Sequence, residues 1–156
     1  MDGLVMLVVV AAGVSVLAWA LRPKARKGHP HQNSADHQPK FPRIDGTGKY
    51  AVEVVGESHY RRSFEALLGE AAYTDRELTG DAVLQLQDNN PHDDQAVAVF
   101  VQGRQVGHLT RDMARTFRKA LKRDGFGQLR EVAVGCRIYG GGAEGHFSVR
   151  LDLPAV

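Results

Sequence analysis

The stretch Asn89–Leu109 constrains the fold most, because turn-forming and strand-forming residues follow one another in it. Asn90 and Asp93 suit the outer positions of a type I turn, and Pro91 presets φ at its second position. The valines that follow alternate with small or polar residues, as a half-buried strand requires. Gln102-Gly103 then reverses the chain, so the stretch predicts a β-hairpin. Its inward-facing residues should be Val97, Val99, Val106 and Leu109.

The rest of the chain from Tyr50 onward also divides into short segments with the periodicity of strands or helices. The predicted strands are residues 50–55, 81–87, 95–101, 105–109, 130–139 and 147–153, and the predicted helices are residues 62–68 and 111–123. Gly69 ends the first helix, and Thr110 can cap the second. Six short strands with two helices predict a mainly β domain of the α+β class, built as a small barrel of the kind that binds oligonucleotides.

Three ordered blocks of residues resemble the signature of the HIRAN domain family. The blocks are Val54–Tyr60, then Asn89–Val99 with its Asn-Pro-aromatic-Asp-x-x-Ala-Val pattern, then Gly103–Leu109 with its Val-Gly-His-Leu pattern. The resemblance covers about Tyr50 to Leu153. It implies an OB-like or SH3-like six-stranded barrel with two helices, and it assigns residues 50–156 to one HIRAN domain.

An uncharged run, Leu4–Leu21, precedes this domain. As a helix it would rise about 27 Å, close to the hydrocarbon core of a bilayer. Trp19 sits near one end, where an amphipathic ring prefers the interface. The following flank, Arg22–Lys27, is basic, whereas the preceding flank offers only Asp2. Residues 1–21 are therefore expected to form a single-pass transmembrane anchor in the cell membrane, with the N-terminus outside and the domain cytoplasmic.

Two other interpretations of this run stay open. A cleaved signal peptide would release a secreted domain, and Ala18-Trp19-Ala20 mimics a cleavage site, although the N-terminal flank is acidic rather than basic. The run could also be a buried core helix, although it ends in a basic cluster.

Residues 22–49 form the predicted linker. They contain four prolines, several glycines and three of the seven histidines, and their low hydrophobicity predicts disorder. The linker carries a formal charge of +5 and the domain after it −2, so the basic character of the chain belongs to the linker. These charges either rest on anionic lipid or only fix the topology.

No catalytic constellation is visible, and the chain is expected not to be an enzyme. It has no Gly-x-x-x-x-Gly-Lys-Ser/Thr loop, and Ser58 does not lie in a nucleophile elbow. The single cysteine, Cys136, cannot form an internal disulfide, which fits a reducing cytoplasm, and it is expected to be a small core residue. No cofactor is expected, and zinc is unsupported, because the domain has no ligands at zinc spacing. The three linker histidines could hold a metal weakly, or they could simply belong to a flexible, proline-rich tract. They are His29, His31 and His37.

The resemblance implies a module that grips the 3′-hydroxyl end of single-stranded DNA. Aromatic rings would stack on the terminal bases, a carboxylate would accept the hydroxyl, and basic groups would hold phosphates. Carried over by position, the aromatic places fall on His59, Tyr60, His92 and Phe147, the carboxylate on Asp93, and the remaining places on His108 and the basic Arg111. His146 is an alternative to Phe147.

Three positions depart from the family's pattern. Ser58 stands where the family has a basic residue, and His59 and His92 stand at tyrosine-type positions. Because imidazole stacks less area than phenol, a weaker or pH-sensitive grip is expected. Arg61 and Arg62 could replace the missing charge.

Structural roles compete with these assignments. Asp93 could simply close its turn, and three of the rings could be core residues: Tyr60, His108 and Phe147. The basic stripe of the second helix could attract phosphates or be an ordinary solvated face. Its members are Arg111, Arg115, Arg118 and Lys122.

The sequence thus predicts a membrane-tethered, nucleic-acid-binding module that recognises single-stranded DNA ends. The alternative is a protein-interaction domain that recruits a partner to the membrane without binding DNA. The charge of −2 on the domain and the loss of a basic residue at Ser58 favour that alternative.

Overall fold

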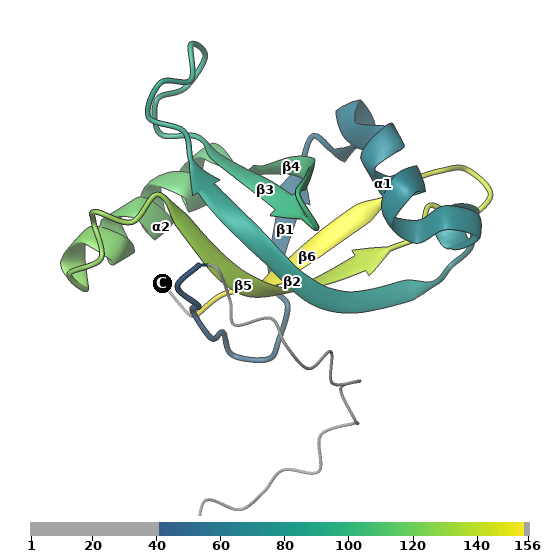
Figure 1. Ribbon diagram of the computed structural model, residues 1–156, viewed down its shortest axis with the longest axis horizontal. Helices are drawn as coiled ribbons and strands as arrows, with labels where there is room; N and C mark the ends of the chain where they lie inside the picture. Colours follow the sequence, from purple (N-terminus) through teal and green to yellow (C-terminus); the bar gives the residue numbers. More distant parts are fainter. Residues whose placement is uncertain (1–40, 155–156) are drawn as a thin grey trace, which may run out of the picture. The chain divides into compact units, whose positions relative to one another are not determined.

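The structure is a computed structural model that describes residues 41–154. Its strands are β1 (Val52–Val55), β2 (Glu77–Leu86), β3 (Val97–Val101), β4 (Arg104–Leu109), β5 (Glu131–Tyr139) and β6 (Ser148–Asp152). Its α-helices are α1 (Arg61–Leu68) and α2 (Arg111–Arg123), and its 3-10 helices are η1 (Glu57–Tyr60) and η2 (Gly69–Tyr73) (Figure 1).

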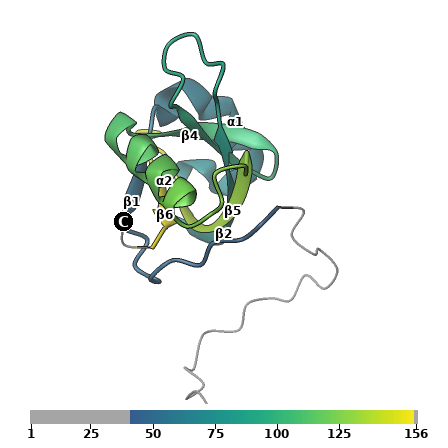
Figure 2. The same cartoon turned by 90° about the vertical axis from the view of Figure 1, so that its left-hand side faces the viewer.

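The six strands close into one antiparallel barrel in the order β1-β4-β3-β2-β5-β6, with β6 pairing back onto β1. Figures 1 and 2 show α1 and α2 outside the barrel and well apart from each other. The α+β barrel predicted from the sequence is therefore confirmed, with each strand and helix expected after residue 50 in place.

The largest difference in boundaries concerns β2, which begins at Glu77 rather than at Asp81. Its first half continues the ladder with β5, where Glu77 lies opposite Tyr139 and Gly80 opposite Cys136. Most side chains of this half are exposed, so it lacks the alternation that marks the second half.

The barrel core is built from inward-facing strand residues. The four residues expected to point inward are all buried: Val97, Val99, Val106 and Leu109. Cys136 is fully buried in β5, as expected, and burial raises the pKa of its thiol to about 12. The thiol is therefore protonated at neutral pH and packs as a small apolar group.

A β-bulge in β4 shapes the end of the signature hairpin. Val99 lies opposite Gly107 and Phe100 opposite Gln105, so Val106 is the extra residue between them. The glycine is needed because β1 passes closely here. A Cβ on Gly107 would lie 2.3 Å from Val54 Cγ1 and 2.7 Å from the Val55 carbonyl oxygen.

The segment before β1 lies against the barrel. Ala133 exchanges two backbone hydrogen bonds with it, donating to the Pro42 oxygen at 2.8 Å and accepting from the Ile44 N–H at 2.9 Å. The Gly48 N–H donates to the Asp152 carboxylate at 2.8 Å. Residues 42–48 of the segment expected to be linker thus pack against the barrel.

The predicted anchor at residues 4–21 and most of the linker lie outside the described residues. Within residues 41–154, the structure contains no helix with the length and apolar character that crossing a bilayer requires.

Candidate functional site

Two of the expected rings meet where η1 lies beside the end of β4. Val55 pairs with His108, and the chain then turns into η1 at Gly56, which has φ of 84°. This path places the ring of Tyr60 against that of His108, with centroids 6.2 Å apart and the planes tilted by 54°. Tyr60 is half-buried, and its neighbour His59 is exposed.

The bulge also determines the surroundings of His108. Residues three apart on a regular strand face opposite sides, but the extra residue brings Gln105 and His108 to the same side. Gln105 Nε2 lies 3.1 Å from His108 Nε2. Burial lowers the pKa of His108, so its imidazole is neutral at pH 7. His108 therefore offers a ring and a hydrogen bond here, but no positive charge.

The β2–β3 loop, residues 87–96, carries the expected carboxylate. Asn90 Oδ1 accepts from the N–H of His92 at 2.9 Å, and Asp93 Oδ1 accepts from the N–H of Gln95 at 2.9 Å. The backbone oxygen of Asp93 accepts from the N–H of Ala96 at 3.0 Å. Asp93 therefore has a turn role, but it begins the turn 93–96 rather than closing the predicted turn 90–93. His92 remains exposed.

The second carboxylate oxygen of Asp93 faces α2. Asp93 Oδ2 lies 3.6 Å from Nε of Arg111, the first residue of α2. Thr110 caps this helix by accepting from the Met113 N–H at 3.3 Å. The side chain of Asp93 is 17% exposed and that of Arg111 73%. A pair of this exposure is weak, so Arg111 can turn to another anion at little cost.

Phe147 belongs to a different cluster. It is 8% exposed and stacks on Phe64, with ring centroids 4.9 Å apart and planes 9° apart. The Tyr73 ring packs against Phe147 in a T-shaped arrangement, with ring centroids 5.9 Å apart. Phe147 is therefore packed as a core aromatic, as the competing interpretation expected. Its alternative, His146, is exposed and lies 3.2 Å from Glu144.

A hollow of about 320 Å³ lies beside this cluster, and Ser58, Arg61 and Phe147 contribute to its lining. The Arg61 guanidinium carbon is 5.9 Å from the centroid of the Phe147 ring. Arg61 thus brings a cation to a hollow that Ser58 also lines. Ser58 is the position where the family pattern has a basic residue.

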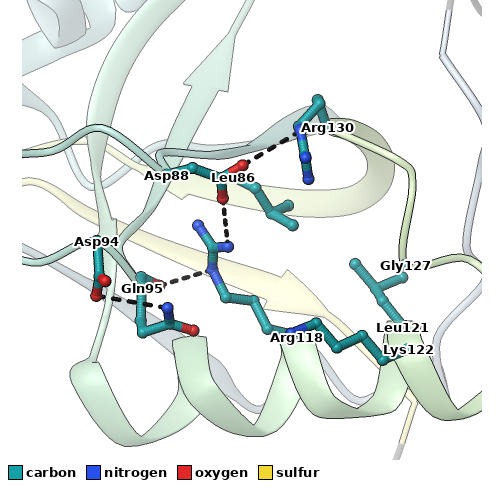
Figure 3. A pocket seen from close by; sticks show the side chains of 9 residues that line it. All are labelled: Leu86, Asp88, Asp94, Gln95, Arg118, Leu121, Lys122, Gly127 and Arg130. Carbon is teal, nitrogen blue, oxygen red and sulfur yellow. Dashed lines mark hydrogen bonds and ion pairs between the residues drawn. The ribbon is translucent and has the colours of Figure 1, made fainter.

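Arg118 is the residue of this region whose role sequence reasoning missed. Its side chain is 8% exposed, although it belongs to the basic stripe of α2. Nε donates to the Gln95 oxygen at 2.9 Å and Nη1 to Asp88 Oδ1 at 2.7 Å (Figure 3). Nη2 donates to the Ala96 oxygen at 3.0 Å. These bonds fasten both ends of the β2–β3 loop to α2.

The basic stripe is consequently not a uniform phosphate-facing surface. Arg118 is taken up by the loop and Arg111 pairs with Asp93, while Arg115 and Lys122 are exposed. The only sequence signal for the burial of Arg118 is its place on the helix, next to the apolar face that Ala114 and Leu121 bury.

The described part of the chain is thus a closed α+β barrel that carries an aromatic pair and a carboxylate–arginine pair near the β4–α2 junction. Within residues 41–154, no group of three or more His, Cys, Asp or Glu side chains is placed to hold a metal ion. The HIRAN domain family model matches residues 47–140, so the chain belongs to the HIRAN domain family. Phe147 follows the matched residues. Neither a curated protein nor a solved structure matches the chain.

Proposed function

We propose that this protein is a membrane-tethered module that binds the 3′-hydroxyl end of single-stranded DNA. HIRAN domains are in general nucleic-acid-binding modules rather than catalytic ones, which supports the binding class. The observation that carries the finer proposal is the placing of two pairs on either side of the β4–α2 junction: Tyr60 with His108, and Asp93 with Arg111.

Each pair has a distinct task in the proposed mechanism. The rings of Tyr60 and His59 stack on the last bases. The neutral His108 ring packs against Tyr60 and holds it in position. Asp93 Oδ2 accepts a hydrogen bond from the terminal hydroxyl and repels a terminal phosphate. Arg111 leaves Asp93 to meet a backbone phosphate, and Arg61 supplies the charge that Ser58 lacks.

The end preference tests the role of Asp93. Asp93→Asn keeps Oδ1 for the Gln95 N–H but replaces the charged second oxygen with an uncharged amide NH2, which cannot accept from the hydroxyl. We expect the wild-type preference for 3′-hydroxyl over 3′-phosphate oligonucleotides to disappear, measured by fluorescence anisotropy on the full-length chain in detergent. Asp75→Asn, which neutralises an exposed carboxylate outside the β2–β3 loop, is the matched control and should keep the preference. An unchanged preference in Asp93→Asn would leave Asp93 a turn residue only.

Tyr60 tests the stacking contribution. Tyr60→Ala is expected to weaken binding of every single strand by about 1–3 kcal/mol, whatever its end group, because stacking ignores both sequence and end. The control is Phe126→Ala, which removes an exposed ring outside the proposed site and should leave the affinity for single strands unchanged. Should wild type itself bind no oligonucleotide in a salt-dependent manner, the protein-interaction alternative would take its place.

The membrane tether rests on the sequence. The uncharged run 4–21 and the basic flank after it support an anchor with the domain in the cytoplasm. Protease added outside intact cells or spheroplasts is therefore expected to spare the barrel and to digest it only after lysis. Digestion in intact cells would contradict this topology.

A further inference from the structure

A pocket of about 310 Å³ lies between α2, the β2–β3 loop and the turn that leads into β5. Figure 3 shows its lining side chains around a common space. Its apolar part comes from Leu86 and Leu121, which are both buried. The polar part is charged: Arg118 and Lys122 come from α2, and Arg130 comes from the turn just before β5.

Asp88 organises two of these cations. Asp88 Oδ1 lies 2.7 Å from Arg118 Nη1, and its Oδ2 lies 3.2 Å from Arg130 Nε. A guanidinium has five N–H groups, and the loop and Asp88 occupy three of those on Arg118. Two N–H groups of a buried arginine thus remain for a ligand, beside a second arginine that a carboxylate holds in place.

Lys122 supplies a third, exposed cation. It is exposed, and none of the ion pairs among the described residues uses its ammonium. Gly127 lets the turn approach closely, since a Cβ there would lie 3.1 Å from Lys122 Cγ. The three cations outnumber the two lining carboxylates, Asp88 and Asp94, although the domain as a whole is acidic.

We propose that this pocket binds a phosphate group through Arg118, Lys122 and Arg130. Planar guanidinium groups match phosphate oxygens in pairs, and a lysine adds a point charge. None of the three cations belongs to the proposed end-binding site, and Lys122 follows Arg111 by eleven positions, roughly 16 Å along the helix. The pocket adjoins that site through Asp94 and Gln95, the neighbours of Asp93 in the β2–β3 loop. The phosphate is therefore either that of a free phosphate compound or one in a strand that continues past the β2–β3 loop.

Inorganic phosphate is the first probe. We expect phosphate, compared with chloride at equal ionic strength, to raise the melting temperature of the full-length chain in detergent and to shift amide NMR signals near Arg130. The double variant Lys122→Gln/Arg130→Gln should lose at least about ten-fold in phosphate affinity. Both residues are exposed, so the variant should fold. Lys119→Gln, an exposed cation of α2 outside the pocket, is the matched control.

Oligonucleotides distinguish the two sources of phosphate. If the pocket takes a backbone phosphate, the double variant should lower the salt slope for a hexamer by about one to two units and leave a dinucleotide unaffected. If it takes a free phosphate compound, the double variant should lose inorganic phosphate but keep the hexamer. Either result supports the proposal. It is overturned if wild type responds equally to phosphate and chloride while the double variant binds both oligonucleotides as wild type does. Loss of end preference in Asp93→Asn reports on the other site alone.

Discussion

Replacing Gly107 with alanine is expected to cost the domain about 3 kcal/mol of unfolding free energy. The new Cβ would lie 2.3 Å from Val54 Cγ1 and 2.7 Å from the Val55 oxygen, far inside contact distance. The first group is a side chain that could turn, but the second is backbone of the β1–β4 ladder. Either β1 moves away or the bulge opens, and both loosen barrel closure.

Gly80→Ala is the matched control, because it places the same methyl group on a strand glycine with nothing within 4 Å. Chemical denaturation of both variants, followed by circular dichroism, should show a lower midpoint for Gly107→Ala and little change for Gly80→Ala. Equal midpoints would mean that β1 does not pass as closely as the structure has it.

The second large effect is expected at Arg118. Arg118→Met keeps an unbranched apolar stem but deletes the three hydrogen bonds, leaving the Gln95 and Ala96 oxygens without this donor. Bonds from a charged donor contribute about 1.5–3 kcal/mol each, and water can replace part of them at this partly open site, so we expect a total loss of about 2–3 kcal/mol. Hydrogen exchange should rise mainly in residues 87–96. A loss spread evenly over the barrel would contradict a local clamp.

The Arg118 effect should depend on pH through Asp88. The hydrogen bond from Arg118 lowers the pKa of Asp88 below its ordinary value. A carboxylate with a lowered pKa stabilises the fold above the unfolded pKa, near 4, and this contribution is lost as the pH falls through the lowered value. The stability difference between wild type and Arg118→Met should therefore shrink on acidification below about pH 4. Lys119→Met, which removes an exposed cation of α2 that forms no ion pair among the described residues, is the control.

The sequence predicted the barrel well because its strands carry local signals. The alternation of valines, the turn at Gln102-Gly103 and the cap at Thr110 each act over a few residues, and they all point to the same fold. The extension of β2 was missed because Glu77–Gly80 is mostly exposed, so pairing with β5 rather than burial makes it a strand.

Prediction of the site was less complete, for physical reasons. The resemblance assigned Tyr60, His108, Asp93 and Arg111 to one binding site without predicting which of them touch. The structure has the contacts Tyr60–His108 and Asp93–Arg111. Arg118 could not be recognised, because two of its acceptors are backbone oxygens more than twenty positions away, and backbone acceptors leave no trace in residue types. Phe147 could not be separated from the surface rings, because its burial depends on packing against α1.

The fastening of the β2–β3 loop by Arg118 has a thermodynamic consequence for recognition. Ordering a loose loop on binding costs about 0.5–1.5 kcal/mol for each immobilised side chain, and this cost lowers the binding affinity. Here the turn that carries Asp93 is already fixed by its own hydrogen bonds and by the helix beneath it. A strand bound as proposed would therefore meet a preorganised surface, and we expect discrimination between ligands to lie in their dissociation rates rather than in their association rates.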